Sequence, residues 1–195
     1  HGLTLAARGS EAAPFLSIDT LHVSAPWSLL RGRIAANTIE AAGVRIDVVR
    51  RADGSSNLPL FADSQGSGLE RFDIGRLLVR RADLMYRDEV SALSVNAQGV
   101  SLDLRPQSDG AIAGPLEIER GPRIRVGQRE SMATHVTGRV AFDGTSLLLN
   151  RVIYESAEGR LTADGRLDSV LSHPRADISV EGSLSLDGLS RLLML

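Results

Sequence analysis

The feature that most constrains the fold is a pattern of apolar residues, glycines and turns that recurs after 56 positions. The positions that recur, each with its second copy, are Ile18 and Ile74, Leu21 and Leu77, Val23 and Val79, Gly43 and Gly99, Val44 and Val100, Ile46 and Leu102, Val48 and Leu104, and Asp53-Gly54 and Asp109-Gly110. The spacing is constant (74−18, 99−43 and 109−53 all equal 56), so the unit keeps its register. These residue types form strands and turns, so we expect function to come from the shape of the repeat.

Apolar and polar residues alternate with a period of two along most of the chain, which is typical of strands that bury one face. The parity changes between Ile18 and Leu21, which indicates a bulge or bend near Asp19-Thr20. Two strands, Ile34 to Ile39 and Val44 to Val49, are expected to join across Ala41-Ala42-Gly43. The other expected strands lie near Leu3 to Leu5, Leu16 to Val23, Ile74 to Val79, Leu84 to Tyr86, Leu93 to Val95, Val100 to Leu104, Leu116 to Ile118, Ile124 to Val126, Val136 to Phe142, Leu147 to Tyr154, Leu161 to Leu167 and Ile178 to Leu186.

Turn residues separate these strands. Asp-Gly suits the positive φ angles of tight hairpins, so consecutive strands are expected to be antiparallel neighbours. The dipeptide occurs at Asp53-Gly54, Asp109-Gly110, Asp143-Gly144, Asp164-Gly165 and Asp187-Gly188. Residues 52–70 form the one long loop expected, and a short helical turn is expected from Pro26 to Gly32. Asp187 either caps a second short helix or precedes a strand.

The sequence therefore predicts an all-β fold: an elongated, mostly antiparallel, curled sheet that forms an open β-groove, with one or two short helical turns. We expect a single repeat-built domain over 1–195, with units at about 15–71 and 72–128 and a looser strand array at 129–195. Because the chain begins with His1 rather than Met, we interpret it as a fragment of a longer protein. A closed sandwich of two sheets remains the alternative arrangement.

Composition and motifs argue against several function classes. A net charge of −2, from 22 basic and 24 acidic residues spread along the chain, gives no patch for nucleic acid. The chain has no Cys and no His-x-x-x-His spacing, so no metal or other cofactor is expected. Asp83 and Asp88 flank Tyr86 as a paired-acid site would, but charges on a solvated strand face explain them more simply. No residue is predicted to be catalytic, and the protein is not expected to be an enzyme.

The repeat motifs resemble the AsmA/TamB group of bacterial envelope proteins, which includes bridge-like members related to chorein-type lipid-transfer proteins. The resemblance rests on motifs within about the first hundred residues: Ile18-x-x-Leu21-x-Val23, Pro26 to Ile34, Ile39-x-x-x-Gly43-Val44-x-Ile46, Asp53 to Pro59, and Ile74-x-x-Leu77-x-Val79-x-x-Ala82-x-Leu84-x-Tyr86-x-Asp88. It implies a periplasmic protein of a Gram-negative bacterium, anchored to the inner membrane through a segment outside this chain. It also implies a curled sheet whose apolar groove conducts phospholipid toward the outer membrane and supports outer-membrane biogenesis.

The expected ligand is phospholipid, and outer-membrane assembly proteins are the expected partners. The residues expected to line the groove share the inward parity of the repeat: Ile18, Val23, Ile39, Val44, Ile46, Val48, Ile74, Val79, Val95, Val100, Leu102 and Leu104. A strip of this kind holds acyl chains by burying methylene groups, at about 0.8 kcal/mol each. Two alternatives stay open: a closed β-sandwich without lipid transport, and a β-repeat that binds other proteins along its sheet edges or takes part in outer-membrane protein assembly.

Overall fold

The computed structural model describes residues 2–6, 14–24, 35–57, 73–169 and 175–185. These residues form twelve strands and no helix. The strands are β1 (Leu3–Ala6), β2 (Pro14–Ser24), β3 (Ala35–Ala36), β4 (Thr38–Arg50), β5 (Asp73–Ile74), β6 (Leu77–Asp88), β7 (Leu93–Pro106), β8 (Ile112–Val126), β9 (Arg129–Phe142), β10 (Leu147–Ser156), β11 (Gly159–Asp168) and β12 (Arg175–Leu184). The expected helical turns at Pro26 to Gly32 and after Asp187 lie outside the described residues, as does most of the expected long loop. In the described part of the chain, no helix has the length and apolarity needed to cross a membrane.

Ten of the strands make one sheet in the order β1-β2-β4-β6-β7-β8-β9-β10-β11-β12, while β3 and β5 form a separate parallel pair. Every neighbouring pair in the ten-stranded sheet is antiparallel except β4 and β6, which are parallel. The predicted mostly antiparallel order is confirmed. The parallel pair was not predicted, because it depends on how the chain returns between Asn57 and Asp73 rather than on any local turn signal.

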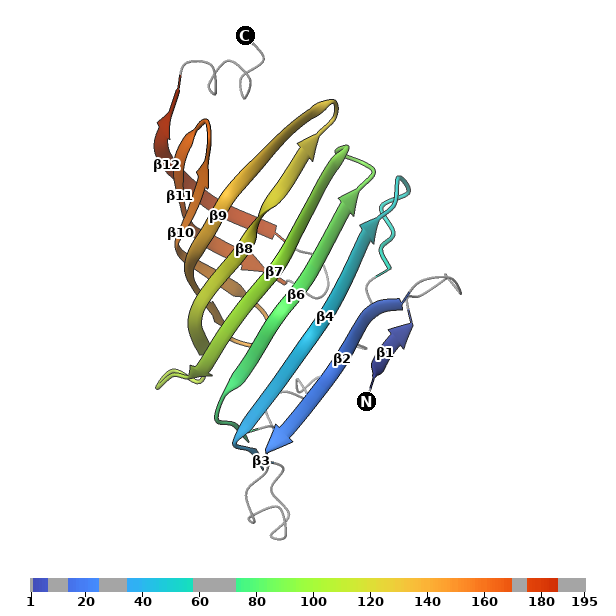
Figure 1. The fold of residues 1–195 in the computed structure, drawn as a ribbon, viewed down its shortest axis with the longest axis vertical. Coiled ribbons are helices and arrows are strands. Elements are labelled where there is room, and N and C mark those ends of the chain that lie inside the picture. The colour runs from blue at the N-terminus through green and yellow to red at the C-terminus, as the bar shows by residue number, and fades with distance from the viewer. Residues whose placement is uncertain (1, 7–13, 25–34, 58–72, 170–174, 186–195) are drawn as a thin grey trace.

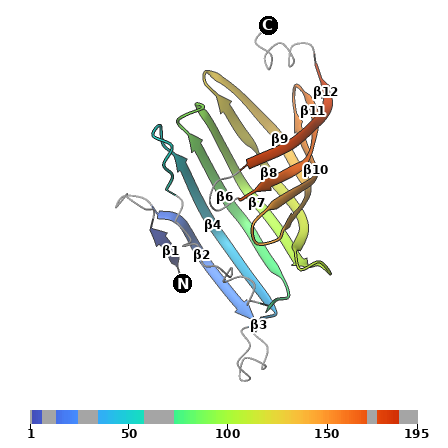
Figure 2. The same ribbon diagram turned by 180° about the vertical axis from the view of Figure 1, so that it is seen from behind.

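The sheet is open and curled (Figure 1). In Figure 1 strands β10 to β12 pass behind β8 and β9, and in the reverse view of Figure 2 they lie in front of the same strands. The last strands therefore bend over one face of the sheet, which becomes its concave face. The predicted open, curled sheet is confirmed, and no second sheet covers it among the described residues, as a closed sandwich would require.

The strands are longer than the sequence predicted, because segments expected as separate strands are joined in the middle. Residues 34–39 and 44–49 were expected as two strands, yet β4 runs without a break from Thr38 to Arg50. Three expected pairs of segments likewise merge into single strands, in β6, β7 and β8.

The change in the apolar alternation within these strands is caused by residues with positive φ, not by turns between separate strands. These residues, which we call the crease, are Gly43 in β4 (φ 64°), Arg81 in β6 (φ 53°), Gly99 in β7 (φ 69°) and Arg151 in β10 (φ 48°). Each lies near the middle of its strand, and each shifts the alternation by one residue.

The expected irregularity at Asp19-Thr20 lies opposite the crease. Ile18 pairs with Val44 and Thr20 with Ala42, so Asp19 faces Gly43 and neither strand carries an extra residue. The change of apolar parity is thus shared by β2 and β4. An aspartate on the next strand also supports two other crease residues: Asp83 Oδ1 accepts a hydrogen bond from Gly99 N at 3.3 Å, and Asp164 Oδ1 accepts one from Arg151 N at 2.8 Å.

Two of the repeated Asp-Gly turns have the same geometry. Gly54 (φ 82°) and Gly110 (φ 86°) both donate to the carbonyl three residues earlier. In each turn the aspartate side chain accepts a hydrogen bond from the backbone two residues later. Asp143-Gly144 also forms a turn, between β9 and β10.

The prediction of a hairpin turn at Asp164-Gly165 is wrong. The dipeptide lies inside β11, where Asp164 bonds Arg151 of the neighbouring strand. Asp187-Gly188 lies outside the described residues.

Candidate functional site

One face of the ten-stranded sheet carries nearly all of its large aliphatic side chains, and we call it the apolar face. Residues that pair across neighbouring strands point to the same side, so the pairing defines rows that cross the sheet. The central rows contain Ile18 and Val44; Leu16, Ile46, Leu84 and Ala97; Ala41, Val79, Leu102 and Leu116; and Ala82, Val100, Ile118, Val136, Tyr154 and Leu161. A continuous apolar surface therefore extends from β2 to β11.

The structure brings all but one of the predicted lining residues onto this face. Ile18, Val44, Ile46, Val79 and Val100 pack in one cluster with Ala41 and Ala82. Leu102 lies opposite Val79 in one of the rows that contain this cluster. The other residues lie in flanking rows, with Val23, Ile39 and Leu104 in one and Val48 and Val95 in another.

Ile74 is the exception. It lies in the two-residue strand β5, where it pairs with Ala36 outside the ten-stranded sheet. The repeat had matched it to Ile18 of β2, but β6 begins three residues later, at Leu77.

The apolar face is only partly shielded from solvent. Most buried apolar residues of the described chain are alanine or valine, and Leu104 is the largest of them. The larger Leu, Ile and Tyr side chains of the central rows stay half-buried. Such an open face retains apolar surface that a ligand or partner can bury.

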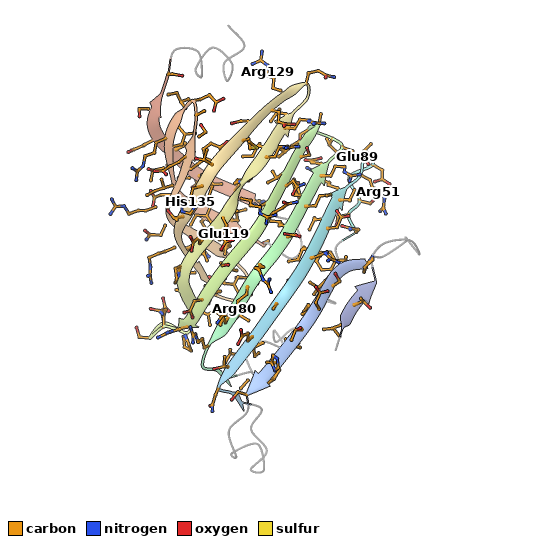
Figure 3. The ribbon with its side chains drawn as sticks, viewed as in Figure 1. Arg51, Arg80, Glu89, Glu119, Arg129 and His135 are labelled. Atoms are coloured by element: carbon orange, nitrogen blue, oxygen red, sulfur yellow. The ribbon has the colours of Figure 1, made fainter. Side chains whose placement is uncertain are left out.

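The opposite, convex face is polar and held by ion pairs. Arg76 donates two hydrogen bonds of 2.7 Å to the carboxylate of Asp103, and Arg80 pairs with Glu40 at 2.7 Å. Arg80 and His135 lie on the side turned to the viewer in Figure 3, away from the strands that bend behind. This face gives the sheet a solvated exterior, so the two faces differ sharply in polarity.

Polar groups also reach the apolar face, at one end of the strands. We call this end the polar margin and define it by the row of Arg50, Asp88, Leu93, Val126 and Arg129, with Tyr86 and Ser131 of the next row inward. We include Tyr154, which lies in a central row but whose hydroxyl group reaches Ser131. It is the end of the sheet that carries Arg51, Glu89 and Arg129 in Figure 3.

Asp88 is the centre of the polar margin and is 5% exposed. Its carboxylate accepts hydrogen bonds from Ser91 Oγ (2.9 Å) and Val90 N (2.9 Å), and it pairs with Arg50 Nη1 at 3.3 Å. Burial alone would raise the pKa of Asp88, but these hydrogen bonds and the charge of Arg50 outweigh it and hold the pKa below its usual value. Asp88 is therefore an ionised, fully satisfied group that ends β6 and starts the turn to β7.

Two tyrosines lie beside this row. Tyr86 is next to Asp88 in β6, and burial, reinforced by the charge of Asp88, raises its pKa. Tyr154 Oη lies 2.7 Å from Ser131 Oγ, and burial also raises the pKa of Tyr154. Each tyrosine adds a hydroxyl group to a largely apolar ring, a combination that suits the border between apolar and wet surroundings.

The carboxylates that flank Tyr86 cannot act as a pair. Asp88 lies in the row of Arg50 on the apolar face, whereas Asp83 lies opposite Arg45 on the other face. No group of three or more His, Cys, Asp or Glu within the described residues is placed to hold a metal ion. The apolar face is therefore lined mainly by aliphatic side chains.

Sequence reasoning missed the polar margin. The signal was present, because Arg50 continues the parity of Ile46 and Val48, and Asp88 that of Leu84 and Tyr86. The sequence interpretation of Asp88 as a charge on a solvated strand face is wrong, because Asp88 is buried on the apolar face. Only the pairing of β4 with β6 shows that Arg50 and Asp88 lie in one row.

No protein-family model matches the chain, and a search of curated proteins finds no matching sequence. The fold and the site therefore define a structural class: an open, mostly antiparallel β-sheet with a continuous apolar face and a polar exterior.

Proposed function

We propose that this chain is a segment of an AsmA/TamB-like envelope protein, and that its apolar face binds phospholipid and conducts it between the inner and outer membranes. In this proposal the protein has no enzymatic activity and supports outer-membrane biogenesis. It works in the periplasm of a Gram-negative bacterium, anchored to the inner membrane by another segment. The observation that carries the proposal is a continuous apolar face that no second sheet covers among the described residues.

The energetics favour a bound acyl chain. Each methylene group transferred from water to an apolar surface contributes about 0.8 kcal/mol. The rows are lined mainly by Val, Leu, Ile and Ala, which offer few specific polar contacts that would trap a chain at one place. A sheet of this kind binds acyl chains by burying them along its apolar rows.

Photocrosslinking tests the proposal directly. A photoreactive residue at Ile46, on the apolar face, is expected to form adducts with phospholipid when the protein is incubated with vesicles and irradiated. The matched control is the same residue at Arg45, the exposed neighbour on the other face. Equal labelling at the two positions, or none at Ile46, would contradict the proposal.

A pair of arginine substitutions tests conduction. Leu102→Arg places a charge on the apolar face, and Ser101→Arg places the same charge one residue away on the other face. Leu102 is half-buried, so its replacement should cost about 1 kcal/mol of folding free energy, half the value for a fully buried leucine. Transfer of fluorescent phospholipid between donor and acceptor vesicles should fall for Leu102→Arg and stay unchanged for Ser101→Arg. A loss of several kcal/mol on Leu102→Arg would instead indicate a closed core.

A further inference from the structure

The two ends of the strands differ in chemistry where they meet the apolar face. At the polar margin the row of Arg50 and Asp88 brings charge to this face. At the opposite end, which we call the apolar margin, the last row crosses β7 to β12 and is apolar throughout: Pro106, Ile112, Phe142, Leu147, Leu167 and Ala176. The next row inward is also apolar, from Val23 and Ile39 through Leu77 to Leu104. The face is therefore asymmetric across the width of the sheet.

The charge that the polar margin presents to a ligand is positive. Asp88 is 5% exposed and its oxygens already accept bonds from Ser91, Val90 and Arg50. The side chain of Arg50 is 49% exposed and meets Asp88 through Nη1 alone. The exposed half of this side chain leaves guanidinium N–H donors accessible, and their planar arrangement matches the oxygens of a phosphate.

We propose that phospholipid lies crosswise on the apolar face, with its phosphate bound by Arg50 at the polar margin and its acyl chains directed along the strands toward the crease. The inference rests on the proposed function and adds an orientation and a headgroup contact to it. The occupant is a glycerophospholipid, since it combines an anionic phosphate with chains that the apolar rows can bury.

The distances agree with this orientation. One acyl chain spans roughly 15 Å, half of a bilayer core of about 30 Å. A strand rises about 3.3 Å per residue, so a chain that starts at Arg50 reaches about five residues along β4. It ends near Val44, in the buried cluster that also contains Ala41 and Ala82.

Two photoreactive phospholipids test the orientation on the intact chain. One carries a diazirine in the headgroup and the other carries it at the end of an acyl chain, and adducts are located by mass spectrometry. The headgroup probe is expected to label peptides of the polar margin, such as the end of β4. The chain-end probe is expected to label the central rows around Val44 and Val100. Headgroup adducts at Phe142 or Leu147 would overturn the orientation.

A binding experiment tests the contact itself. Arg50→Gln should weaken binding of fluorescent phosphatidylglycerol about fivefold, the upper range for a half-exposed ion pair. Binding of diacylglycerol with the same chains should not change, because it has no phosphate. Arg45→Gln, on the opposite face of the same strand, should affect neither ligand, and Arg50→Lys should restore part of the loss. Thermal unfolding of each variant confirms that it is folded.

The outcomes separate the inference from the proposed function. If Arg50→Gln binds phosphatidylglycerol as tightly as the parent protein, or loses diacylglycerol to the same extent, the headgroup contact is wrong and the apolar site remains. If the parent protein binds neither lipid, the proposed function fails and the inference fails with it.

Discussion

Replacement of Gly43 by alanine is expected to be the most damaging single-methyl change in the crease. Gly43 has a φ of 64°, and a Cβ built there would lie 2.9 Å from Asp19 Cβ and closer still to the Asp19 carboxylate. Gly99 has nearly the same φ, 69°, but its nearest neighbour would be Glu119 Cβ at 3.5 Å, an ordinary contact. Both variants incur the left-handed backbone penalty of about 1–2 kcal/mol. Only Gly43→Ala adds overpacking, at about 1–3 kcal/mol.

Urea unfolding of the two variants measures this difference. The free energy of unfolding should fall by about 2–5 kcal/mol for Gly43→Ala and by about 1–2 kcal/mol for Gly99→Ala. Asp19→Ala in the Gly43→Ala background removes the carboxylate and should recover part of the excess. The reasoning is refuted if Gly99→Ala proves as destabilising as Gly43→Ala, because the contact with Asp19 would then contribute nothing.

Two further predictions concern charge and backbone strain. The paired hydrogen bonds from Arg76, opposed by burial, lower the pKa of Asp103 below its usual 3.8. The ionised carboxylate therefore stabilises the folded state at any pH above the unfolded-state pKa, and this stabilisation is lost as the pH falls through the folded-state pKa. Asp103→Asn should therefore flatten the loss of stability between about pH 5 and pH 3, measured by urea unfolding, and an unchanged pH profile would show that the pair contributes nothing. Arg151 has a φ of 48°, so Arg151→Gly should stabilise by about 0.5 kcal/mol, whereas Arg139→Gly in the regular part of β9 should destabilise by about that amount. Thermal unfolding gives the sign of each change, and equal signs would contradict this account.

Sequence periodicity was sufficient to predict the all-β fold and nearly all of the apolar face. The alternation of apolar and polar residues indicates which side of a strand is apolar. This assignment stays correct when two predicted strands are in fact one strand. Strand continuity through Gly43 and Gly99 could not be predicted, because a shift of parity looks the same whether the chain turns or only kinks. Arg81 and Arg151 also have a left-handed backbone, but neither is a glycine, so their residue type gave no indication of it.

Two features of the site were not predicted from the sequence, for a different reason. Ile74 obeys the repeat, yet the return of the chain from β4 places it beside Ala36 instead of in the sheet. Arg50 and Asp88 meet only because β4 and β6 are parallel, which depends on chain topology and not on local residue preferences. Rows that cross a sheet are a property of the assembled fold, so charges that share a row are hard to recognise from one sequence.

The parallel neighbours β4 and β6 also bear on how a chain of this kind can change in length. Strands β2 and β4 form one antiparallel pair, and β6 and β7 form another. Because β4 and β6 are parallel where the two pairs meet, both pairs enter the sheet with their apolar side chains on the same face. Duplication or deletion of a whole pair in the gene would therefore lengthen or shorten the sheet without turning any later strand over. A sheet of this kind can therefore change in length by whole units, and each unit leaves the surface of its neighbours intact.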